Sequence, residues 1–311
     1  MKTINIIGCG SVGRTLARSW TEHQVLEVRS VVNRSLGSAE RAVTFVGAGR
    51  ACGGYEQMQS ADLVMISVPD DAIEECCRQL CASQMVEDGV IVFHCSGSLS
   101  TSVLQPAADR GALIASVHPI KSFAHPTGAM ETFAGTFCAI EGEPSAYDIL
   151  EELLQRSGAR TFRIDPQRKT VYHAATVMVC NYLTALLEVG LRCFQHAGIP
   201  RHTAMEMMEP IVTETVANVF STGTVEALTG PIARGDKDAV QRECEVLGQW
   251  DANCQQIYKH LGLVAVDLSA AQGNASSEAL GAIRSILFDK NCPTDERTET
   301  PESGAAFDDT A

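Results

Sequence analysis

Positive charge is in short supply in this sequence of 311 residues. Lys and Arg number 24 against 38 Asp and Glu, and the formal net charge is −14. Seven acids and two bases lie in residues 289–311, which leaves a net charge of about −9 on the rest. Surfaces of that sign are repelled by phosphate backbones and by anionic lipid headgroups. We therefore expect no nucleic acid and no membrane among the main partners.

Cysteine is plentiful, but the spacings that hold metals or staple small secreted domains are missing. The twelve cysteines form no C-x-x-C pair, and several lie within apolar runs such as VMVCNY and TFCAIE. We also expect no secretory leader, since MKTINIIGCG is a strand pattern that runs into a glycine turn. These features predict buried thiols in a reducing cytoplasm, with neither disulfides nor a metal site.

Residues 171–194 (VYHAATVMVCNYLTALLEVGLRCF) are long and apolar enough to suggest a membrane span. His173, Asn181, Glu188 and Arg192 interrupt the run. We expect instead a helix buried in a soluble protein, with a homodimer interface as the place for its apolar surface.

Strand signals are confined to the first half of the chain. Short apolar runs alternate with helical ones: INIIG, EVRSVVN, DLVMISV, VIVFHC, LIASVH, TFCAIEG and ARTFRID. The early runs are continuously apolar, as in strands that helices cover on both faces, and they predict a doubly wound parallel sheet of the α/β class. Helical patterns then occupy 167–195, 201–220, 236–248, 251–272 and 276–288. The predicted organisation is an α/β domain over 1–165, an all-helical domain over 166–288 and a disordered acidic tail over 289–311.

The first strand run leads into a glycine motif. Gly8-Cys9-Gly10-Ser11-Val12-Gly13 follows INII, and a helical pattern starts at Ser11. The first glycine suits a tight turn, the second lets the backbone approach a pyrophosphate, and the third allows close helix–strand packing. The free N–H groups of the helix N-terminus favour phosphates. Residues 1–165 are therefore predicted to be a Rossmann-type dinucleotide-binding domain, the alternative being a glycine turn without a ligand.

The end of the second strand run indicates which dinucleotide binds. Asn33 stands where an NAD site has an acid for the ribose 2′-OH, and Arg34 and Ser35 follow it. A carboxylate would repel a 2′-phosphate, whereas a guanidinium and a hydroxyl bind it. The sequence therefore predicts NADP(H).

Polar residues follow later strand runs, at the carboxyl edge of the sheet where ligands bind in such folds. Ser67-Val68-Pro69 follows one run and the segment HCSGS, residues 94–98, follows the next. The small residues allow a nicotinamide to come close, although a loop and a helix cap explain the serines equally well. The cofactor contacts predicted here are Ser67, Val68, Pro69, His94 and Ser96.

Reduction of a carbonyl or an imine needs a proton donor and, for an acidic substrate, a cation. The candidates are His94, His118, Lys121, His125, Lys169, His173 and Arg234. Lys169 and His173 are four residues apart and share a helix face, and Asn181 lies far enough along to flank the same cleft. A nearby nicotinamide cation and desolvation would lower the pKa of Lys169 and make it a usable acid.

The motifs GCGSVG, SVPDDAI, HCSGS, HPIKSF, FAGTFCAIEG, KTVYHAATVMVCN and LTGPIARGD occur in this order and together span residues 1–290. The set resembles the Rossmann-like oxidoreductases whose C-terminal half was long catalogued as a domain of unknown function. These are relatives of 6-phosphogluconate dehydrogenase, pyrroline-carboxylate reductase and ketopantoate reductase. One branch of this family, the PanG type, reduces ketopantoate.

Site residues follow from the resemblance position by position. Better-known ketopantoate reductases carry a Lys and then Asn residues on the first long helix of the second domain, and a later loop adds a Ser and an acid. Lys169 matches that Lys, His173 replaces the first Asn, and Asn181 loosely matches the second. The segment TGPIARGD, residues 229–236, resembles the later loop. It would contribute Thr229, Arg234 and Asp236.

The resemblance implies an NADPH-dependent reductase of a small 2-oxo carboxylate, with 2-dehydropantoate as the first substrate to test. Lys169 or His173 would protonate the oxygen, while Ser96, Asn181 and Asp236 would position hydroxyls. Substrate would also meet His118, Lys121, Thr229 and Arg234. Two alternatives stay open: an imine reductase of the pyrroline-carboxylate type, and a regulator that binds NADP(H) without turnover. TGPIARGD also reads as a plain helix stop, with Asp236 as the cap of the next helix.

Overall fold

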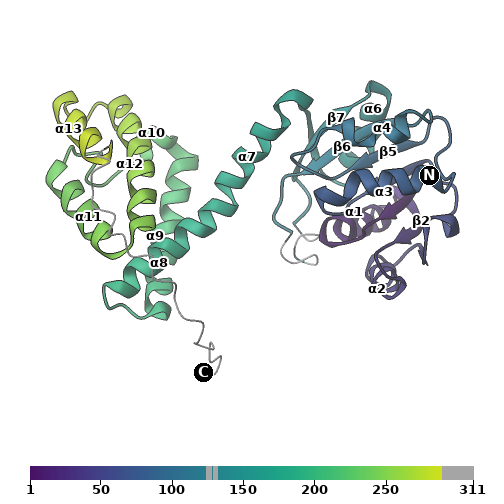
Figure 1. Cartoon of the computed structure of the whole chain (residues 1–311), viewed down its shortest axis with the longest axis horizontal. Coiled ribbons are helices and arrows are strands. Elements are labelled where there is room, and N and C mark those ends of the chain that lie inside the picture. The colour runs from purple at the N-terminus through teal and green to yellow at the C-terminus, as the bar shows by residue number, and fades with distance from the viewer. Residues whose placement is uncertain (124–127, 129–131, 289–311) are drawn as a thin grey trace. The chain divides into compact units, whose positions relative to one another are not determined.

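The computed structural model describes residues 1–123, 128 and 132–288. The chain forms two compact units, Met1–Ala185 and Leu186–Ala311, which are treated separately here (Figure 1). The sheet ends at Arg163, close to the predicted boundary at 165, but the first unit continues into the long helix that follows. His125 and the predicted acidic tail 289–311 lie outside the described residues.

The first unit is built on one sheet of eight strands in the order β3-β2-β1-β4-β5-β6-β7-β8. The strands are β1 (Lys2–Ile7), β2 (Leu26–Val32), β3 (Arg50–Cys52), β4 (Leu63–Ile66), β5 (Ile91–His94), β6 (Leu113–Pro119), β7 (Phe137–Gly142) and β8 (Arg160–Arg163). All seven strand runs identified in the sequence are strands, and the α/β class is confirmed. The short strand β3 was not predicted, because three residues form no recognisable run.

The sheet is not wholly parallel. β7 runs antiparallel to β6, with Val117 opposite Ile140, while β8 returns parallel to β7. The sheet is therefore parallel from β3 through β6, as predicted for a doubly wound sheet, and the antiparallel pairing of β7 with β6 is a departure that the sequence did not indicate. The β7 sequence does not indicate whether the strand pairs parallel or antiparallel, since a strand covered on both faces is apolar in either orientation.

Helices cover both faces, as predicted for a doubly wound sheet (Figure 1). Alternate residues of β4 divide between two cores, with Met65 in one and Ile66 in the other. The first core includes α1 (Ser11–Glu22), α2 (Leu36–Val46) and α6 (Pro144–Arg156), and the second includes α3 (Asp70–Ala82), the 3₁₀ turn η2 (Thr101–Leu104) and α4 (Gln105–Ala108). The carboxyl ends of β1, β4, β5 and β6 are thereby held at one edge.

The second unit contains helices and no strand as far as the structure describes it, up to Phe288. Its helices are the greater part of α8 (Asn181–His196), then α9 (Arg201–Thr222), α10 (Thr224–Ala227), α11 (Lys237–Trp250), α12 (Ala252–Gln272) and α13 (Ser277–Phe288). The four helical patterns predicted beyond residue 200 match α9, α11, α12 and α13 closely. A core that includes Ile232, Val240, Val266 and Ile283 joins the last three helices to the preceding loop.

The long apolar helix is divided into two segments. It consists of α7 (Lys169–Val179) and α8, separated at Cys180, after the short 3₁₀ turn η3 (Pro166–Arg168). By length and composition Pro166–His196 could cross a membrane, a test that core helices also pass, but only 6% of its most apolar window is buried. Within the described chain this helix is therefore mostly uncovered, and the expectation that a homodimer interface covers its apolar surface stays a prediction.

Candidate active site

The glycine motif forms a turn between β1 and α1 that is shaped by its packing. Gly8 has φ of +81°, and a Cβ there would lie 2.3 Å from Cγ1 of Val68. A Cβ at Gly13 would lie 2.6 Å from Oγ of Ser67. The Ser67 hydroxyl also donates to the Gly8 carbonyl at 2.8 Å. The predicted residues Ser67 and Val68 thus lie directly against the glycine turn, at the end of β4.

Gly10 has a different environment from the other two glycines. A Cβ at this position would meet nothing within 4 Å, so the absence of a side chain here is not required by packing. Gly10 precedes the first turn of α1, whose N–H groups have no side-chain cap and no intrahelical acceptors. This open, donor-rich turn is the arrangement that binds a pyrophosphate. The Cys9 thiol is buried, which raises its pKa to about 12 and leaves it a packing group.

Asn33 anchors the turn from the end of β2. Its Oδ1 accepts a hydrogen bond from the Cys9 N–H at 2.7 Å, and its Nδ2 donates to Ser38 Oγ at 3.1 Å. Ser35 caps α2, since its Oγ accepts from the Ser38 N–H at 3.4 Å. Arg34 is exposed and has no hydrogen bond or ion pair with the residues that the structure describes. The three predicted residues are therefore adjacent, and Arg34 is available for a ligand.

A cavity of about 220 Å³ opens at the carboxyl edge of the sheet. It begins at Val12 of the glycine motif and extends to His118 and His173. Its lining consists of Val12, Ser67, Val68, Asp70, Cys95, Ser96, Gly97, His118, Pro119, Lys121, Phe123 and His173. The structure thus brings six of the predicted site residues besides Val12 into one cavity: Ser67, Val68, Ser96, His118, Lys121 and His173.

Two imidazoles form one wall of this cavity. The His118 and His173 rings meet edge to face with centroids 5.7 Å apart. Burial, reinforced by His173 and Lys169, lowers the pKa of His118 to about 4. A Cβ at Gly97 would lie 2.4 Å from His173 Cδ2 and 2.7 Å from His118 Nε2. The glycine of HCSGS is therefore needed for the rings to fit.

Ser96 and Ser98 both face Asp70, at the start of α3. Their hydroxyls donate to Asp70 Oδ2 at 2.8 and 2.6 Å. Ser96 Oγ in turn accepts from the Leu99 N–H at 3.0 Å. Ser96 lines the cavity as predicted, but its hydroxyl proton is already committed to Asp70.

His94, the last residue of β5, does not line the cavity. It is fully buried, its Nδ1 accepts from the Ser96 N–H at 3.1 Å, and its Nε2 lies 3.2 Å from the Ser100 carbonyl. Burial, and then the Lys169 charge, lower its pKa to about 3. His94 is neutral and hydrogen-bonded to the loop that follows it, and its predicted contact with the cofactor stays a prediction.

Lys169 is buried and does not line the cavity. Its side chain is 1% exposed, and Nζ lies 3.3 Å from Glu141 Oε1, whose side chain is 2% exposed. Nζ also donates to Ser116 Oγ, and Glu141 accepts from the Thr101 N–H at 2.8 Å. Burial lowers the pKa of Lys169, and the Glu141 carboxylate opposes that effect. This ammonium is held in a buried ion pair, so the cavity offers it no direct contact with a substrate.

Of the other residues predicted in the first unit, one lines the cavity and two do not. Lys121 lines the cavity and donates to the Thr132 carbonyl and Oγ1 at 2.9 and 2.8 Å. Pro69 precedes α3 and Asn181 begins α8; neither lines the cavity.

TGPIARGD belongs to the second unit, where Gly230 and Gly235 have positive φ between α10 and α11. Asp236 caps α11 through a 3.0 Å bond from the Ala239 N–H. Thr229 and Arg234 are exposed. The linker interpretation of this loop has a structural basis, and its substrate role stays a prediction.

Three residues that contact the predicted site residues were not singled out from the sequence: Asp70, Glu141 and Tyr172. Glu141 could have been noticed as an acid inside the apolar strand FCAIEG, because a buried carboxylate needs a cation or hydrogen-bond donors. Asp70 and Tyr172 carry no such signal, since both stand in ordinary helical sequence. Across the described ranges no group of His, Cys, Asp and Glu has the arrangement of a metal site, and no two of the eleven described cysteines form a disulfide.

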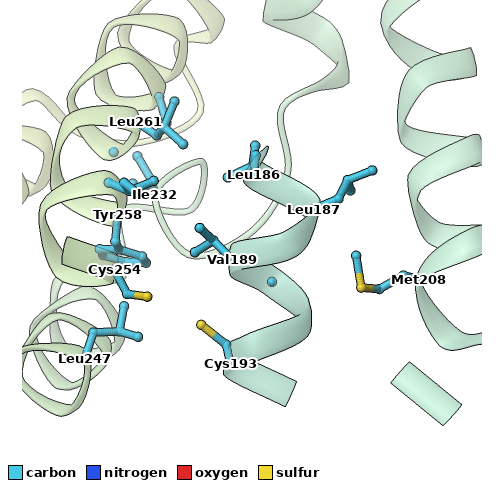
Figure 2. Close-up of a pocket in the computed structure, with 14 residues that line it drawn as sticks. Leu186, Leu187, Val189, Cys193, Met208, Ile232, Leu247, Cys254, Tyr258 and Leu261 are labelled. Atoms are coloured by element: carbon cyan, nitrogen blue, oxygen red, sulfur yellow. The ribbon is translucent and has the colours of Figure 1, made fainter. Parts of the chain in front are cut away.

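A second cavity, of about 430 Å³, lies within the helical unit. Figure 2 shows Leu186, Val189 and Cys193 of α8 facing Cys254, Tyr258 and Leu261 of α12. The lining is almost wholly apolar and contains neither an acid nor a base. This cavity offers no chemistry for a reduction.

The domains match known families in two segments. Residues 2–119 match the Rossmann-like domain family, and residues 136–264 match a domain of unknown function, DUF2520. A Thermotoga maritima protein of known structure is 21% identical with a TM-score of 0.70, covering 87% of this chain and 99% of its own. A candidate NADP oxidoreductase from Bacteroides fragilis is 19% identical with a TM-score of 0.69, covering 85% and 97%.

The 1-pyrroline-5-carboxylate reductase of Streptococcus pyogenes is also similar, at 16% identity and a TM-score of 0.58, over 91% of this chain and 98% of that one. At such identities the likeness establishes the fold, while function has to be argued from the site. The chain joins a Rossmann-like domain to a DUF2520 domain.

Proposed function

We propose that the protein is an NADPH-dependent oxidoreductase that reduces a small 2-oxo carboxylate. One observation carries the proposal: the helix that starts at the glycine turn contributes Val12 to the same cavity that His118 and His173 line. A dinucleotide seated on the turn would therefore have its reactive end near two imidazoles. In doubly wound folds this carboxyl edge is where such ligands bind.

The residues present fit two groups of the cofactor, its pyrophosphate and its 2′-phosphate. The open backbone at Gly10 and the uncapped first turn of α1 would hold the pyrophosphate. Arg34, exposed and unpaired within the described structure, would hold the 2′-phosphate. When bound, NADPH supplies a hydride to the substrate carbon.

The protein completes the reduction with a proton. His173 lines the cavity and is partly exposed, so we assign it as the donor to the substrate oxygen, which then becomes a hydroxyl. His118 is held neutral beside it and serves as a hydrogen-bonding group. Lys169 acts through Ser116 and Glu141 and keeps the floor of the site in place. Lys121 is the cation of the cavity that can meet a substrate carboxylate.

We take 2-dehydropantoate as the leading substrate, in the cytoplasm and in the synthesis of pantothenate. The test is the loss of NADPH absorbance with a panel of 2-oxo acids and cyclic imines that includes this compound. Turnover of 2-dehydropantoate that is lost in His173→Ala supports the proposal. Tight NADPH binding without turnover of any member would instead indicate a regulator. A normal KM in Arg234→Ala would remove TGPIARGD from the substrate site.

Reduction of a cyclic imine is the second candidate. It is favoured by the burial of Lys169, because a protonated imine needs no lysine donor, and by the similarity to the Streptococcus pyogenes reductase. A higher kcat/KM for pyrroline-5-carboxylate than for every 2-oxo acid of the panel would replace the leading substrate by this one.

We also propose a homodimer. Lys169 is the one buried residue of α7, whereas Val171 and Val179 on the same helix are 68% and 74% exposed. In α9, Ile211 is 63% and Phe220 87% exposed. Apolar surface of this extent is uncommon on monomers, and a second copy would cover it. Sedimentation that gives a monomer at micromolar concentration would contradict the assignment.

A further inference from the structure

Tyr172 stands behind His118, on the side away from Gly97. Its hydroxyl lies 2.7 Å from His118 Nδ1, and the two rings meet edge to face with centroids 5.6 Å apart. The Phe162 ring packs on Tyr172 in the same manner at 6.2 Å. Tyr172 is therefore fixed by aromatic packing on one side and by the imidazole on the other.

The direction of this hydrogen bond follows from the partners available. Burial raises the pKa of Tyr172, so its oxygen keeps the proton, and burial keeps His118 neutral. Nδ1 of His118 is the one hydrogen-bond partner of the Tyr172 hydroxyl in the described part of the chain. A proton on Nδ1 would leave the phenolic proton without an acceptor, a costly arrangement at a half-buried site. Tyr172 therefore donates, Nδ1 accepts, and the imidazole proton lies on Nε2.

Nε2 lies on the cavity side of the ring. It is the atom that a Cβ at Gly97 would approach to 2.7 Å, and both residues line the cavity. Among the described residues no side chain or backbone group is hydrogen-bonded to Nε2. A neutral N–H group is thus directed at the space a ligand would fill.

We propose that Tyr172 is a positioning residue that holds His118 in its Nε2–H tautomer and so makes the cavity select a substrate oxygen with free lone pairs. A carbonyl oxygen accepts the Nε2–H bond. A protonated imine nitrogen presents a proton of its own and cannot accept. The inference rests on the proposed function for its choice of substrate class, but the tautomer can be observed without turnover.

The first experiment is nitrogen NMR of the full-length protein labelled with ¹⁵N at the histidine rings, at neutral pH. The ring signals of His118 are assigned by their absence from the spectrum of His118→Gln and by the contact of this ring with the Tyr172 ring. We expect a protonated Nε2 and an unprotonated Nδ1 in the unaltered protein, and a mixture of tautomers in Tyr172→Phe. A proton on Nδ1 in the unaltered protein, or an unchanged tautomer in Tyr172→Phe, would overturn the proposal. Tyr182→Phe, on an exposed tyrosine, is the matched control.

The second experiment measures kcat with a carbonyl and with an imine substrate. Tyr172→Phe should lower kcat for the carbonyl roughly fivefold or more, with little effect on the imine. His118→Gln places an amide N–H near Nε2 and should retain more carbonyl activity than His118→Asn. Equal losses for both substrates would contradict the selection. If no substrate is turned over, the proposed function fails, while the NMR result still decides whether Tyr172 sets the tautomer.

Discussion

Replacement of Lys169 by Met should destabilise the first unit strongly, because it leaves a carboxylate buried without its cation. The Lys169 and Glu141 side chains are 1% and 2% exposed. After the change Glu141 retains the Thr101 N–H and hydroxyl as donors, at 2.8 and 3.1 Å. Removal of one partner of a buried ion pair costs about 3–5 kcal/mol of unfolding free energy. We expect a loss in that range.

The double variant Lys169→Met/Glu141→Gln separates this electrostatic cost from the loss of packing. Both groups are then neutral, and the Gln can still accept from Thr101. The double variant should therefore recover most of the stability lost in Lys169→Met, since replacing a whole buried pair is often close to neutral. Lys2→Met, at an exposed position on β1, should stay within about 0.5 kcal/mol of the unaltered protein.

Each unit has one tryptophan, which gives the assay its selectivity. Trp20 is buried in α1, and Trp250 ends α11. In a Trp250→Phe background the fluorescence change on urea unfolding reports on the first unit alone. A loss below about 1 kcal/mol in Lys169→Met, or a double variant as unstable as the single one, would refute the picture of a buried ion pair.

Three further outcomes are expected. Gly10→Ala should leave the midpoint of unfolding nearly unchanged, because its Cβ meets no protein atom, but should weaken NADPH binding in calorimetry. Gly13→Ala should lower the midpoint of unfolding, because its Cβ would lie 2.6 Å from Ser67 Oγ. Equal midpoints for the two variants would show that the turn is not packed as described. Arg34→Asp should raise the KM for NADPH roughly 10- to 100-fold and that for NADH far less, with Arg110→Asp as control, and equal effects would exclude a 2′-phosphate contact. Because the pKa of His94 is lowered to about 3 in the folded state, stability should fall as pH drops from about 6.5 towards that value, by up to roughly 1.4 kcal/mol per pH unit. His94→Gln should flatten this part of a stability–pH curve, and an identical slope in both proteins would argue against a buried neutral imidazole.

Local pattern was sufficient for most of the fold. The apolar runs of the first half are the strands of the sheet, and the helical periods beyond residue 200 are helices with nearly the predicted ends. The glycine motif was recognisable because a strand, a turn and a helix have to follow one another for it to form. The antiparallel direction of β7 could not be recognised from the sequence, because strand direction depends on the path of the chain between β6 and β7.

The candidate site could be predicted only in part. The sequence placed Ser96 and His118 at the carboxyl edge of the sheet, since residues after successive parallel strands meet there, and the structure puts both in one cavity with His173. It also suggested Lys169 or His173 as the acid, because helical spacing puts both on the same side of α7. Spacing along a helix does not reveal what each side chain packs against. In the tertiary structure the Lys169 ammonium pairs with Glu141, whereas His173 lines the cavity.

The sequence by itself determined the order of strands and helices, the glycine turn and the replacement of an acid by Asn33 and Arg34, because each depends on residues adjacent in the chain. Only the tertiary structure decided which charges are buried and which groups line the cavity. The pairing of Lys169 with Glu141 and of Tyr172 with His118 joins residues 28 and 54 positions apart. Burial and hydrogen bonding of that kind depend on how strands and helices pack, and residue spacing along the chain does not predict this packing.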